Sequence, residues 1–283
     1  YDMQDIYDGL YQKSKDGRKF RNLMQYITCE NNIKLAYRNI KDNAGSKTYG
    51  TDDMNIKDIE RIEVSEFVQI IQRKFKDYQP KAVKRVEIPK EGSDKTRPLG
   101  IPTMKDRAMQ ALYLMALEPL AEMTADAHSY GFRKERCCQD AIQQCHTVLS
   151  HGYSPQWILE GDIKGCFDHI SHEWLLANIP TDKKVLKKWF KCGVIFKGEL
   201  FRTEEGTMQG GIISPTLANM TLDGIQPILA QKYKRICRKG KHYSPMVNLV
   251  RYADDFIITS AKKEVLEREI KPMLVEFLGE RGL

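Results

Sequence analysis

The sequence lacks the features of a membrane protein or a secreted protein. Its 283 residues contain no run of about 18 apolar residues and no visible signal peptide. The seven cysteines show neither the C-x-x-C spacing of a zinc site nor a secreted disulfide pattern. We therefore expect a cytoplasmic, intracellular protein with reduced thiols and no membrane partner. A bacterial and an organellar compartment fit the sequence equally well.

Internal repeats and low-complexity tracts are also missing. The composition, 41% hydrophobic and 29% charged, is that of a globular protein, and the length allows one large domain or two subdomains. The chain begins without Met and ends abruptly in FLGERGL (277–283), so we expect a fragment of a longer protein.

Positive charge is present in excess and is unevenly distributed. The formal net charge is +7, and residues 73–107 carry eleven Lys or Arg against five acidic residues. Lys and Arg that neutralise phosphates supply the sequence-independent part of nucleic-acid affinity, so this segment favours a polyanion-binding surface. The basic runs at 182–191 and 231–241 are interpreted equally well as solvated helix faces.

Hydrophobic periodicity predicts an α+β fold. Helices are expected at 20–27, 64–75, 107–120, 139–149, 172–179, 214–225 and 264–278. Strands are expected at 82–89, 96–102 and 156–163, with two hairpins within 194–203 and 247–259. Hairpins separated by helices indicate a layered α+β architecture.

Two adjacent carboxylates lie inside one of the predicted hairpins. Asp254 and Asp255 stand between the apolar flanks of LVRYADDFII (249–258), a pattern that predicts a strand, a tight turn and a strand. Like charges at such a turn repel each other unless a cation lies between them. The alternatives are therefore a metal site and a solvated hairpin tip.

A third carboxylate stands where another predicted strand ends. Asp162 closes WILEGD (157–162) and either caps the next turn or approaches Asp254. Carboxylate oxygens suit Mg²⁺, which keeps its other positions for water and substrate phosphates. A two-metal site aligns an attacking hydroxyl and stabilises the leaving oxygen in phosphoryl transfer. Together with the basic segment, these residues predict a nucleic-acid enzyme.

Six motifs follow in order over most of the chain. They are NAGSKTYGTDD (43–53), KRVEIPK with KTRPLGIPTMKDRAMQ (84–110), HSYGFRKER (128–136), GDIKGCFDHISH (161–172), GTMQGGIISPTLANMTLD (206–223) and RYADDF (251–256). With these motifs the chain resembles the reverse transcriptases encoded by group II introns, which also act as splicing maturases. Lys84 in place of an arginine, and Lys134 and Met208 in place of prolines, depart from the family pattern without removing a chemical group that the mechanism needs.

The resemblance implies a right-hand polymerase whose antiparallel palm sheet packs on helices. It assigns residues 1–112 to the fingers, 113–179 to the first part of the palm, 180–212 to a return into the fingers, and 213–283 to the second part of the palm. The thumb and the maturase domain are expected to lie outside this chain. We therefore expect the fragment to bind RNA and to extend primers inefficiently.

The resemblance also implies roles for individual residues. Asp162 and Asp254 correspond to metal ligands, joined by the backbone carbonyl of Ile163, and Asp255 is a weaker ligand candidate. The residues implied in nucleotide binding are Lys90 and Arg97 at the triphosphate, Phe167 under the sugar, and Gln209 and Gly210 beside the nascent base pair. Two Mg²⁺ ions are implied, with Mn²⁺ as a substitute.

Each of these residues has a second interpretation that needs no ligand. Lys90 and Arg97 also fit a general basic surface, Gly210 a flexible turn, and Phe167 an ordinary core aromatic. The candidates for contacts with an RNA backbone, taken from the basic segment, are Lys81, Lys84 and Arg85.

The function that the resemblance implies is RNA-directed DNA polymerisation by a protein that also binds intron RNA and supports its splicing and retrohoming. The implied partners are group II intron RNA, an RNA template with a DNA primer, and dNTPs; a homodimer is compatible with the sequence. Two alternatives are an RNA-directed RNA polymerase and an RNA-binding splicing maturase fragment without appreciable polymerase activity. The intact set of Asp162, Asp254, Lys90, Arg97 and Gln209 favours a polymerase.

Overall fold

The computed structural model of the chain describes residues 3–17, 23–90, 92, 94–238 and 241–283. The chain forms two compact units. Unit 1 comprises Tyr1–Met123 and His172–Leu217, and unit 2 comprises Thr124–Ser171 and Ala218–Leu283. We expected boundaries after residues 112, 179 and 212. The first of these falls inside helix α6 (Met104–Thr124), which belongs to unit 1 as far as Met123.

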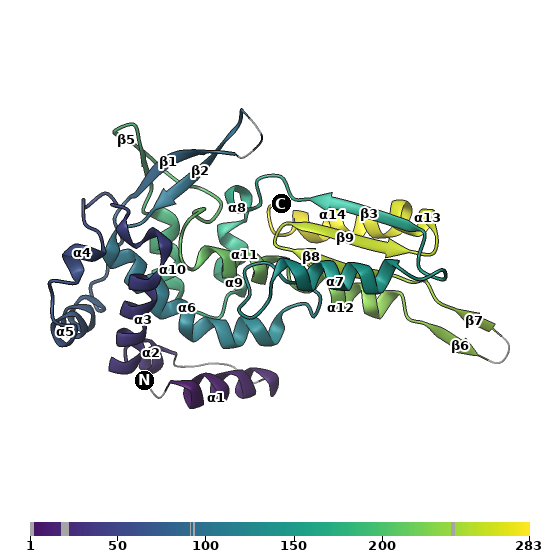
Figure 1. Ribbon diagram of the computed structural model, residues 1–283, viewed down its shortest axis with the longest axis horizontal. Helices are drawn as coiled ribbons and strands as arrows, with labels where there is room; N and C mark the ends of the chain where they lie inside the picture. Colours follow the sequence, from purple (N-terminus) through teal and green to yellow (C-terminus); the bar gives the residue numbers. More distant parts are fainter. Residues whose placement is uncertain (1–2, 18–22, 91, 93, 239–240) are drawn as a thin grey trace. The chain divides into compact units, whose positions relative to one another are not determined.

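Unit 1 is built around helix α6, which is buried along most of its length from Met104 to Leu120. The buried side chains Phe67, Val68 and Ile71 recur at helical spacing on a second helix, as the sequence predicted. The other helices of unit 1, drawn in Figure 1, are α1 (Gln4–Lys15), α2 (Met24–Ile27), α3 (Glu30–Asp42), the 3-10 helix η1 (Ala44–Lys47), α4 (Ile56–Ile59), α5 (Val64–Lys74), α9 (His172–Asn178) and α10 (Lys183–Lys191).

A four-stranded sheet in the order β2-β1-β4-β5 completes unit 1. Strands β1 (Val83–Pro89) and β2 (Thr96–Ile101) form the predicted antiparallel hairpin, in which Lys84 pairs with Ile101 and Pro89 with Thr96. The second predicted hairpin consists of β4 (Val194–Phe196) and β5 (Glu199–Phe201), and β4 pairs with β1 in parallel. The strand predictions for this part of the chain are therefore confirmed.

Unit 2 contains a three-stranded antiparallel sheet in the order β3-β9-β8, together with a short hairpin. Its strands are β3 (Trp157–Asp162), β8 (Asn248–Tyr252) and β9 (Asp255–Ser260), and the short hairpin is β6 (Ile236–Arg238) and β7 (Lys241–Tyr243). Its helices are α7 (Cys138–Leu149), α8 (Cys166–His169), α12 (Ile225–Lys232), α13 (Lys263–Val265), the π-helix η2 (Leu266–Ile270) and α14 (Lys271–Gly279). Helix α11 (Ser214–Leu222) begins in unit 1 and ends in unit 2.

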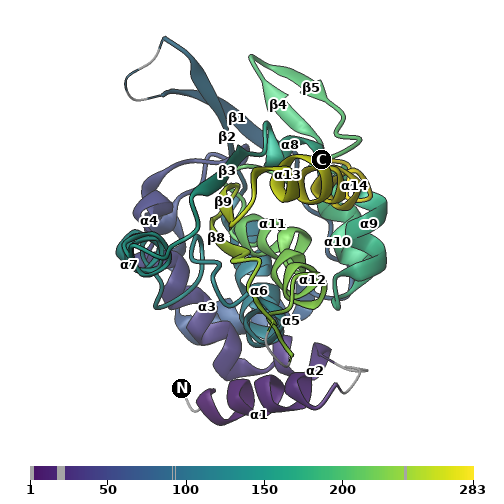
Figure 2. The same cartoon turned by 90° about the vertical axis from the view of Figure 1, so that its right-hand side faces the viewer.

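The two faces of the unit 2 sheet differ. Leu249, Arg251, Phe256 and Ile258 alternate onto one face and are all buried. Helix α12 contacts β8, η2 contacts β3 and β9, and α7 contacts β8. Figure 2 shows α12 and α14 on one side of the sheet and α7 on the other. The helices therefore cover the apolar face more completely than the face that carries the carboxylates.

Three expected helices differ from those observed. The first was expected at 20–27; among its described residues only 24–27 are helical, as the short helix α2, and Phe20 lies outside the described residues. The segment 264–278 is not one regular helix, since a π-helix precedes Pro272, which has no N–H to donate to the carbonyl four residues earlier. The run 231–241 is not one helix face either, because it contains the end of α12 and the strand β6.

Among the described residues, no helix combines the length and the apolar character needed to cross a membrane.

Candidate functional site

A two-residue turn of Ala253 and Asp254 joins β8 to β9, as the sequence predicted. Tyr252 and Asp255 form the pair that closes the hairpin. Ala253 is buried and has a φ of +57°, in the left-handed region that costs an L-residue about 1–2 kcal/mol. Non-glycine residues persist there when surrounding contacts hold them, and such residues cluster at functional sites.

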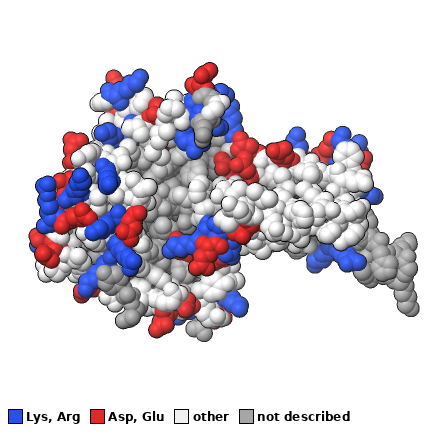
Figure 3. Space-filling view, viewed as in Figure 1, with Lys and Arg blue, Asp and Glu red and all other residues white. Residues whose placement is uncertain are grey.

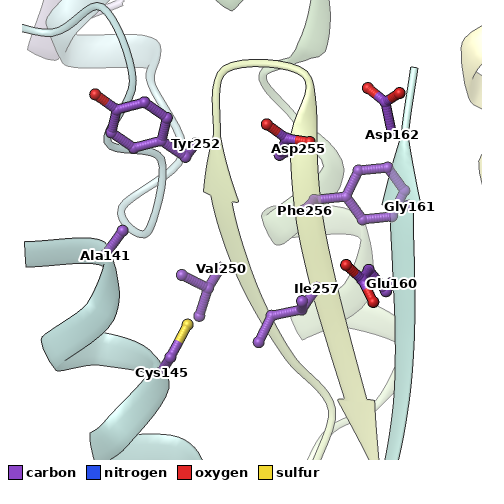
Figure 4. Close-up of a pocket in the computed structure, with 10 residues that line it drawn as sticks. All are labelled: Ala141, Cys145, Glu160, Gly161, Asp162, Val250, Tyr252, Asp255, Phe256 and Ile257. Carbon is purple, nitrogen blue, oxygen red and sulfur yellow. The ribbon is translucent and has the colours of Figure 1, made fainter. Parts of the chain in front are cut away.

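The register of the sheet determines which carboxylates face each other. Asp162, the last residue of β3, pairs directly with Asp255, the first residue of β9. Side chains paired directly across an antiparallel sheet lie on the same face, and Figure 4 shows both carboxylates at the same end of the sheet. Asp254, expected to be a metal ligand together with Asp162, occupies the adjacent turn and is half-buried.

Like charges directly opposite each other in a sheet are destabilising, so this end of the sheet favours a bound cation. In the described part of the chain, no three His, Cys, Asp or Glu side chains converge closely enough to form a complete metal cage. Mg²⁺ is commonly held by one or two carboxylates with waters and substrate phosphates, so the donor set fits that ion and does not fit a structural zinc site.

The chain after β3 turns back at Gly165, whose φ is +64°. The Ile163 carbonyl accepts a hydrogen bond from the Cys166 N–H at 3.1 Å and retains a second lone pair. Burial raises the pKa of the Cys166 thiol to about 12, and the nearby negative charge of Asp254 acts in the same direction. The Cys166 thiol therefore lies close to the carboxylates and stays protonated at neutral pH.

Phe167 follows in α8 and is half-buried, so it is not a core residue. Its ring meets the ring of Phe132 edge to face, with 6.0 Å between the centroids and 81° between the planes. Phe132 is 54% exposed. The pair therefore presents an aromatic surface that solvent reaches.

A cavity of about 450 Å³ runs along the carboxylate-bearing face of the sheet. Its apolar lining comes from Ala141 and Cys145 of α7 and from Val250 and Ile257 of the sheet, as Figure 4 shows. Its polar lining comes from Asp162, Tyr252 and Asp255 near the β8–β9 turn and from Glu160, which lies beside Ile257. In the same region the Phe256 ring packs across Gly161, where an added Cβ would lie 2.3 Å from the ring.

The nucleotide candidates Lys90 and Arg97 lie on the β1–β2 hairpin of unit 1, and both are exposed. Arg97 pairs with Ile88, and the Lys90 N–H donates to the Lys95 carbonyl at 2.9 Å, so Lys90 and Arg97 share one face of the hairpin. On the face of unit 1 that Figure 3 shows, Lys and Arg side chains gather over this hairpin and over α3–α5, with carboxylates among them.

The three candidates for RNA backbone contacts do not form one surface. Lys84 and Arg85 are consecutive in β1 and point to opposite faces of the sheet. Arg85 donates to Glu87 at 3.1 Å and lies over the Phe196 ring, 5.5 Å from its centroid. Lys81 is exposed in the segment before β1. Lys84 and Lys81 are therefore better placed than Arg85 to meet a phosphate.

The basic segment also contains an arginine with a structural role. Arg107 is buried, and its guanidinium donates to the carbonyls of Pro102, Gly45 and Thr48 at 2.8–3.0 Å. It anchors the loop that contains the NAGSKTYGTDD motif. Asp106 of the same segment is also buried, so the excess of basic over acidic residues at the surface of the segment is unchanged.

The candidates Gln209 and Gly210 lie in a loop that packs against β2. The Gly100 N–H donates to the Gln209 carbonyl at 2.6 Å. Gly210 has a φ of +101°, and a Cβ there would lie 2.5 Å from the Gly100 carbonyl oxygen. A Cβ at Gly100 would meet the Met208 side chain at 2.5 Å. Gly210 is therefore required by close backbone approach and a positive φ, which excludes a merely flexible turn, whereas Gly100 makes room for the Met208 side chain.

Sequence reasoning missed a buried polar network behind the carboxylate turn. Arg251 is completely buried and donates to Asp223, Asn219 and the Ala253 carbonyl. Burial raises the pKa of Asp223, and Arg251 beside it opposes part of that shift. The available signals were an arginine inside the strand NLVRY and two polar residues, Asn219 and Asp223, one helical turn apart.

Comparison with known proteins was consistent with the motifs. The model of the family "Reverse transcriptase (RNA-dependent DNA polymerase)" matches residues 88–283. The Group II intron-encoded protein LtrA of Lactococcus lactis subsp. cremoris is 34% identical over 227 residues, which cover 78% of this chain and 37% of LtrA. Protein YkfC of Escherichia coli (strain K12) is 31% identical over 290 residues, which cover 90% of this chain and 76% of YkfC.

This chain therefore spans little more than a third of the length of LtrA. A chain of the partial Cas6-RT-Cas1–Cas2 complex superposes with a TM-score of 0.45 at 20% sequence identity, covering 90% of this chain and 42% of that one, a likeness too distant to add to the assignment. On the family match and on these relatives, the chain belongs to the reverse transcriptase (RNA-dependent DNA polymerase) family and is similar within it to the proteins that group II introns encode.

Proposed function

We propose that this chain is the fingers and palm part of an RNA-directed DNA polymerase that acts by metal-assisted phosphoryl transfer. The observation that carries the proposal is the placement of Asp162 directly across from Asp255, next to Asp254 at the β8–β9 turn. Carboxylates at this edge of the unit 2 sheet supply oxygen donors for a divalent cation, and one or two of them suffice for Mg²⁺, which takes its other ligands from water and substrate phosphates.

In this proposal Asp162 and Asp254 hold the cations, the carbonyl of Ile163 adds a neutral oxygen, and Asp255 has a supporting role. When bound, two Mg²⁺ or Mn²⁺ ions would activate the primer 3′-hydroxyl and stabilise the leaving pyrophosphate oxygen. Asp162 and Asp255 lie at strand ends whose register is fixed by the neighbouring strand, and Asp254 lies in the turn between β8 and β9, so these carboxylates would hold the ions in defined positions.

The fingers residues bind the incoming nucleotide in the same proposal. Lys90 and Arg97 project from one face of the β1–β2 hairpin and pair with the triphosphate, Arg97 through its planar guanidinium. Gln209 and Gly210 flank the nascent base pair on a loop that β2 holds in place. Phe167 lies under the sugar and selects deoxyribose.

We also propose that the protein binds the RNA of a group II intron and supports its splicing and mobility. Support comes from the similarity to the Group II intron-encoded protein LtrA and from the excess of basic residues between 73 and 107. Lys81 and Lys84 are the foremost candidates for backbone contacts.

Primer extension tests the proposal. The complete protein that contains this chain is incubated with Mg²⁺ and a DNA primer annealed to an RNA template, and dNTPs are compared with NTPs. Extension with dNTPs, and not with NTPs alone, is expected. Preferential use of NTPs would make the protein an RNA polymerase. RNA binding without primer extension would support only the splicing role.

A further inference from the structure

We propose that Arg251 is a positioning residue, which holds the turn of Ala253 and Asp254 in the conformation that lets Asp254 bind a divalent cation. The inference rests on the proposed function of Asp254 as a cation ligand. It assigns to Arg251, and to Asn219 and Gly131 behind it, a role that acts through the turn and not through the substrate.

Strand alternation determines where Arg251 points. Tyr252 and Asp255 lie on the face that carries the cavity, so Arg251 lies on the opposite face, among the buried side chains Leu249, Phe256 and Ile258. None of the Arg251 side chain is exposed. A fully buried guanidinium one residue away from Tyr252 cannot contact a nucleic acid, so its effect on catalysis must pass through neighbouring groups.

The guanidinium of Arg251 bonds the turn itself. Its Nη1 donates to the Ala253 carbonyl at 3.1 Å and to Asn219 Oδ1 at 3.1 Å, while Nη2 donates to Asp223 Oδ1 at 2.5 Å. The rigid planar fork therefore joins the carbonyl immediately before Asp254 to two anchors near the C-terminal end of α11.

The anchors are themselves fixed within unit 2. Asp223 Oδ1 also accepts the Asp126 N–H at 3.2 Å, and the Asp126 carboxylate accepts the N–H groups of Gly224 at 3.0 Å and Gln226 at 3.2 Å. Hydrogen bonds thus connect the backbone at the start of α12 to the Ala253 carbonyl, through Asp126, Asp223 and Arg251 in turn.

A second support reaches the turn from the HSYGFR segment. The Asn219 amide donates to the Gly131 carbonyl at 2.8 Å, and a Cβ at Gly131 would lie 2.4 Å from the Ala253 nitrogen. The Tyr130 N–H donates to the Arg251 carbonyl, and the Arg251 N–H donates to the His128 carbonyl, both at 2.9 Å. A side chain at position 131 is therefore excluded, because the turn packs directly against Gly131.

Two features favour positioning over simple stabilisation. A buried ion pair is weak support for stability, because desolvation of both charges offsets much of their attraction. Ala253 holds an unfavourable positive φ, which persists only where surrounding contacts impose it. Groups that orient metal ligands from behind commonly alter metal affinity by about 10- to 100-fold when they are replaced.

The test measures binding of Mn²⁺ alone, by the loss of the free-ion signal in electron paramagnetic resonance, with the complete protein. Arg251→Lys keeps the charge but loses the fork, and we expect its Mn²⁺ affinity to fall about tenfold or more. Arg281→Lys is the matched control, since Arg281 also bonds two backbone carbonyls of unit 2, those of Thr221 and Phe277, with its guanidinium. The control is expected to bind Mn²⁺ like the parent.

Gly131→Ala is the second variant, because it displaces Ala253 sterically and removes no charge or donor. It too is expected to weaken Mn²⁺ binding while circular dichroism shows a folded protein. Parental affinity in a folded Arg251→Lys or Gly131→Ala protein would overturn the inference and leave the proposed function intact. If Asp254→Asn binds Mn²⁺ as the parent does, the cation site itself is wrong, and both proposals fall.

Discussion

Replacing Phe167 with Val tests whether this residue selects the sugar of the incoming nucleotide. The ring is half-buried and packs edge to face on Phe132, so its removal opens space next to an exposed aromatic and not inside a closed core. A 2′-hydroxyl that collides with the phenyl ring would be accepted by the smaller side chain. The selection would act through volume, as a clash against the wrong ligand.

The size of the effect follows from the size of the steric difference. Rejection of one small group by an apolar surface is worth about 1–3 kcal/mol, which corresponds to a change in selectivity of about 10- to 200-fold. Loss of the ring pair itself costs stability of about 0.5–1.5 kcal/mol beyond the lost burial. A protein that depends on Phe167 only for packing would show the second effect and not the first.

The assay is the ratio of kcat/KM for dCTP to kcat/KM for CTP, measured in the parent and in Phe167→Val. We expect the ratio to fall by at least an order of magnitude, chiefly through better use of CTP, with dCTP use reduced far less. Thermal unfolding of both proteins serves as the control for folding. An unchanged ratio in a folded variant would refute the role of Phe167 at the sugar.

Two further predictions concern the surface charge and the half-buried His172. Neutralising Lys81, Lys84 and Arg85 together should reduce the slope of log RNA affinity against log salt concentration by up to about 2. The comparison is neutralisation of the exposed α10 lysines Lys184, Lys187 and Lys191. A larger reduction of the slope in that second variant would place the RNA-binding surface on α10. Burial lowers the pKa of His172 below 6.5, so the unfolded chain takes up a proton first and stability should fall as the pH drops below that value. His172→Gln keeps a donor for the Gly206 carbonyl, and its Tm should therefore fall less than the parental Tm between about pH 7 and pH 5; equal slopes would contradict this.

Much of the fold was predictable because local patterns and tertiary structure agree. The alternation around Asp254 and Asp255 predicted the β8–β9 hairpin, and the apolar spacing on α10 buried Val185, Leu186, Trp189 and Phe190 as expected. The six motifs supplied the family. These signals lie within short segments, so they can be interpreted without knowledge of how distant segments pair.

The register of the sheet was not predictable in the same way. Which of Asp254 and Asp255 lies across from Asp162 depends on pairing between segments about ninety residues apart, and a shift by one residue exchanges the two faces of a strand. No pattern within either segment fixes that register. The structure was needed to place Asp255 opposite Asp162 and Asp254 in the turn.

The buried network was hidden for a related reason. Arg251 reads as one more basic residue in a basic chain, and Asn219 and Asp223 read as polar positions on an ordinary helix. Only the contacts among them show that they share a water-excluded space behind the turn. Arg107 was overlooked in the same way, since charge counts do not distinguish buried from exposed guanidinium groups.

The most direct test of the carboxylate site is the single-turnover rate of dNTP addition by Asp254→Asn, measured with the primer and template already bound. The account predicts that Asp254→Asn abolishes extension while its RNA affinity stays near that of the parent. Asp255→Asn is expected to lose less activity. The surface control Glu267→Gln is expected to lose none. Extension by Asp254→Asn at the parental rate would contradict the assignment of the turn as the catalytic metal site.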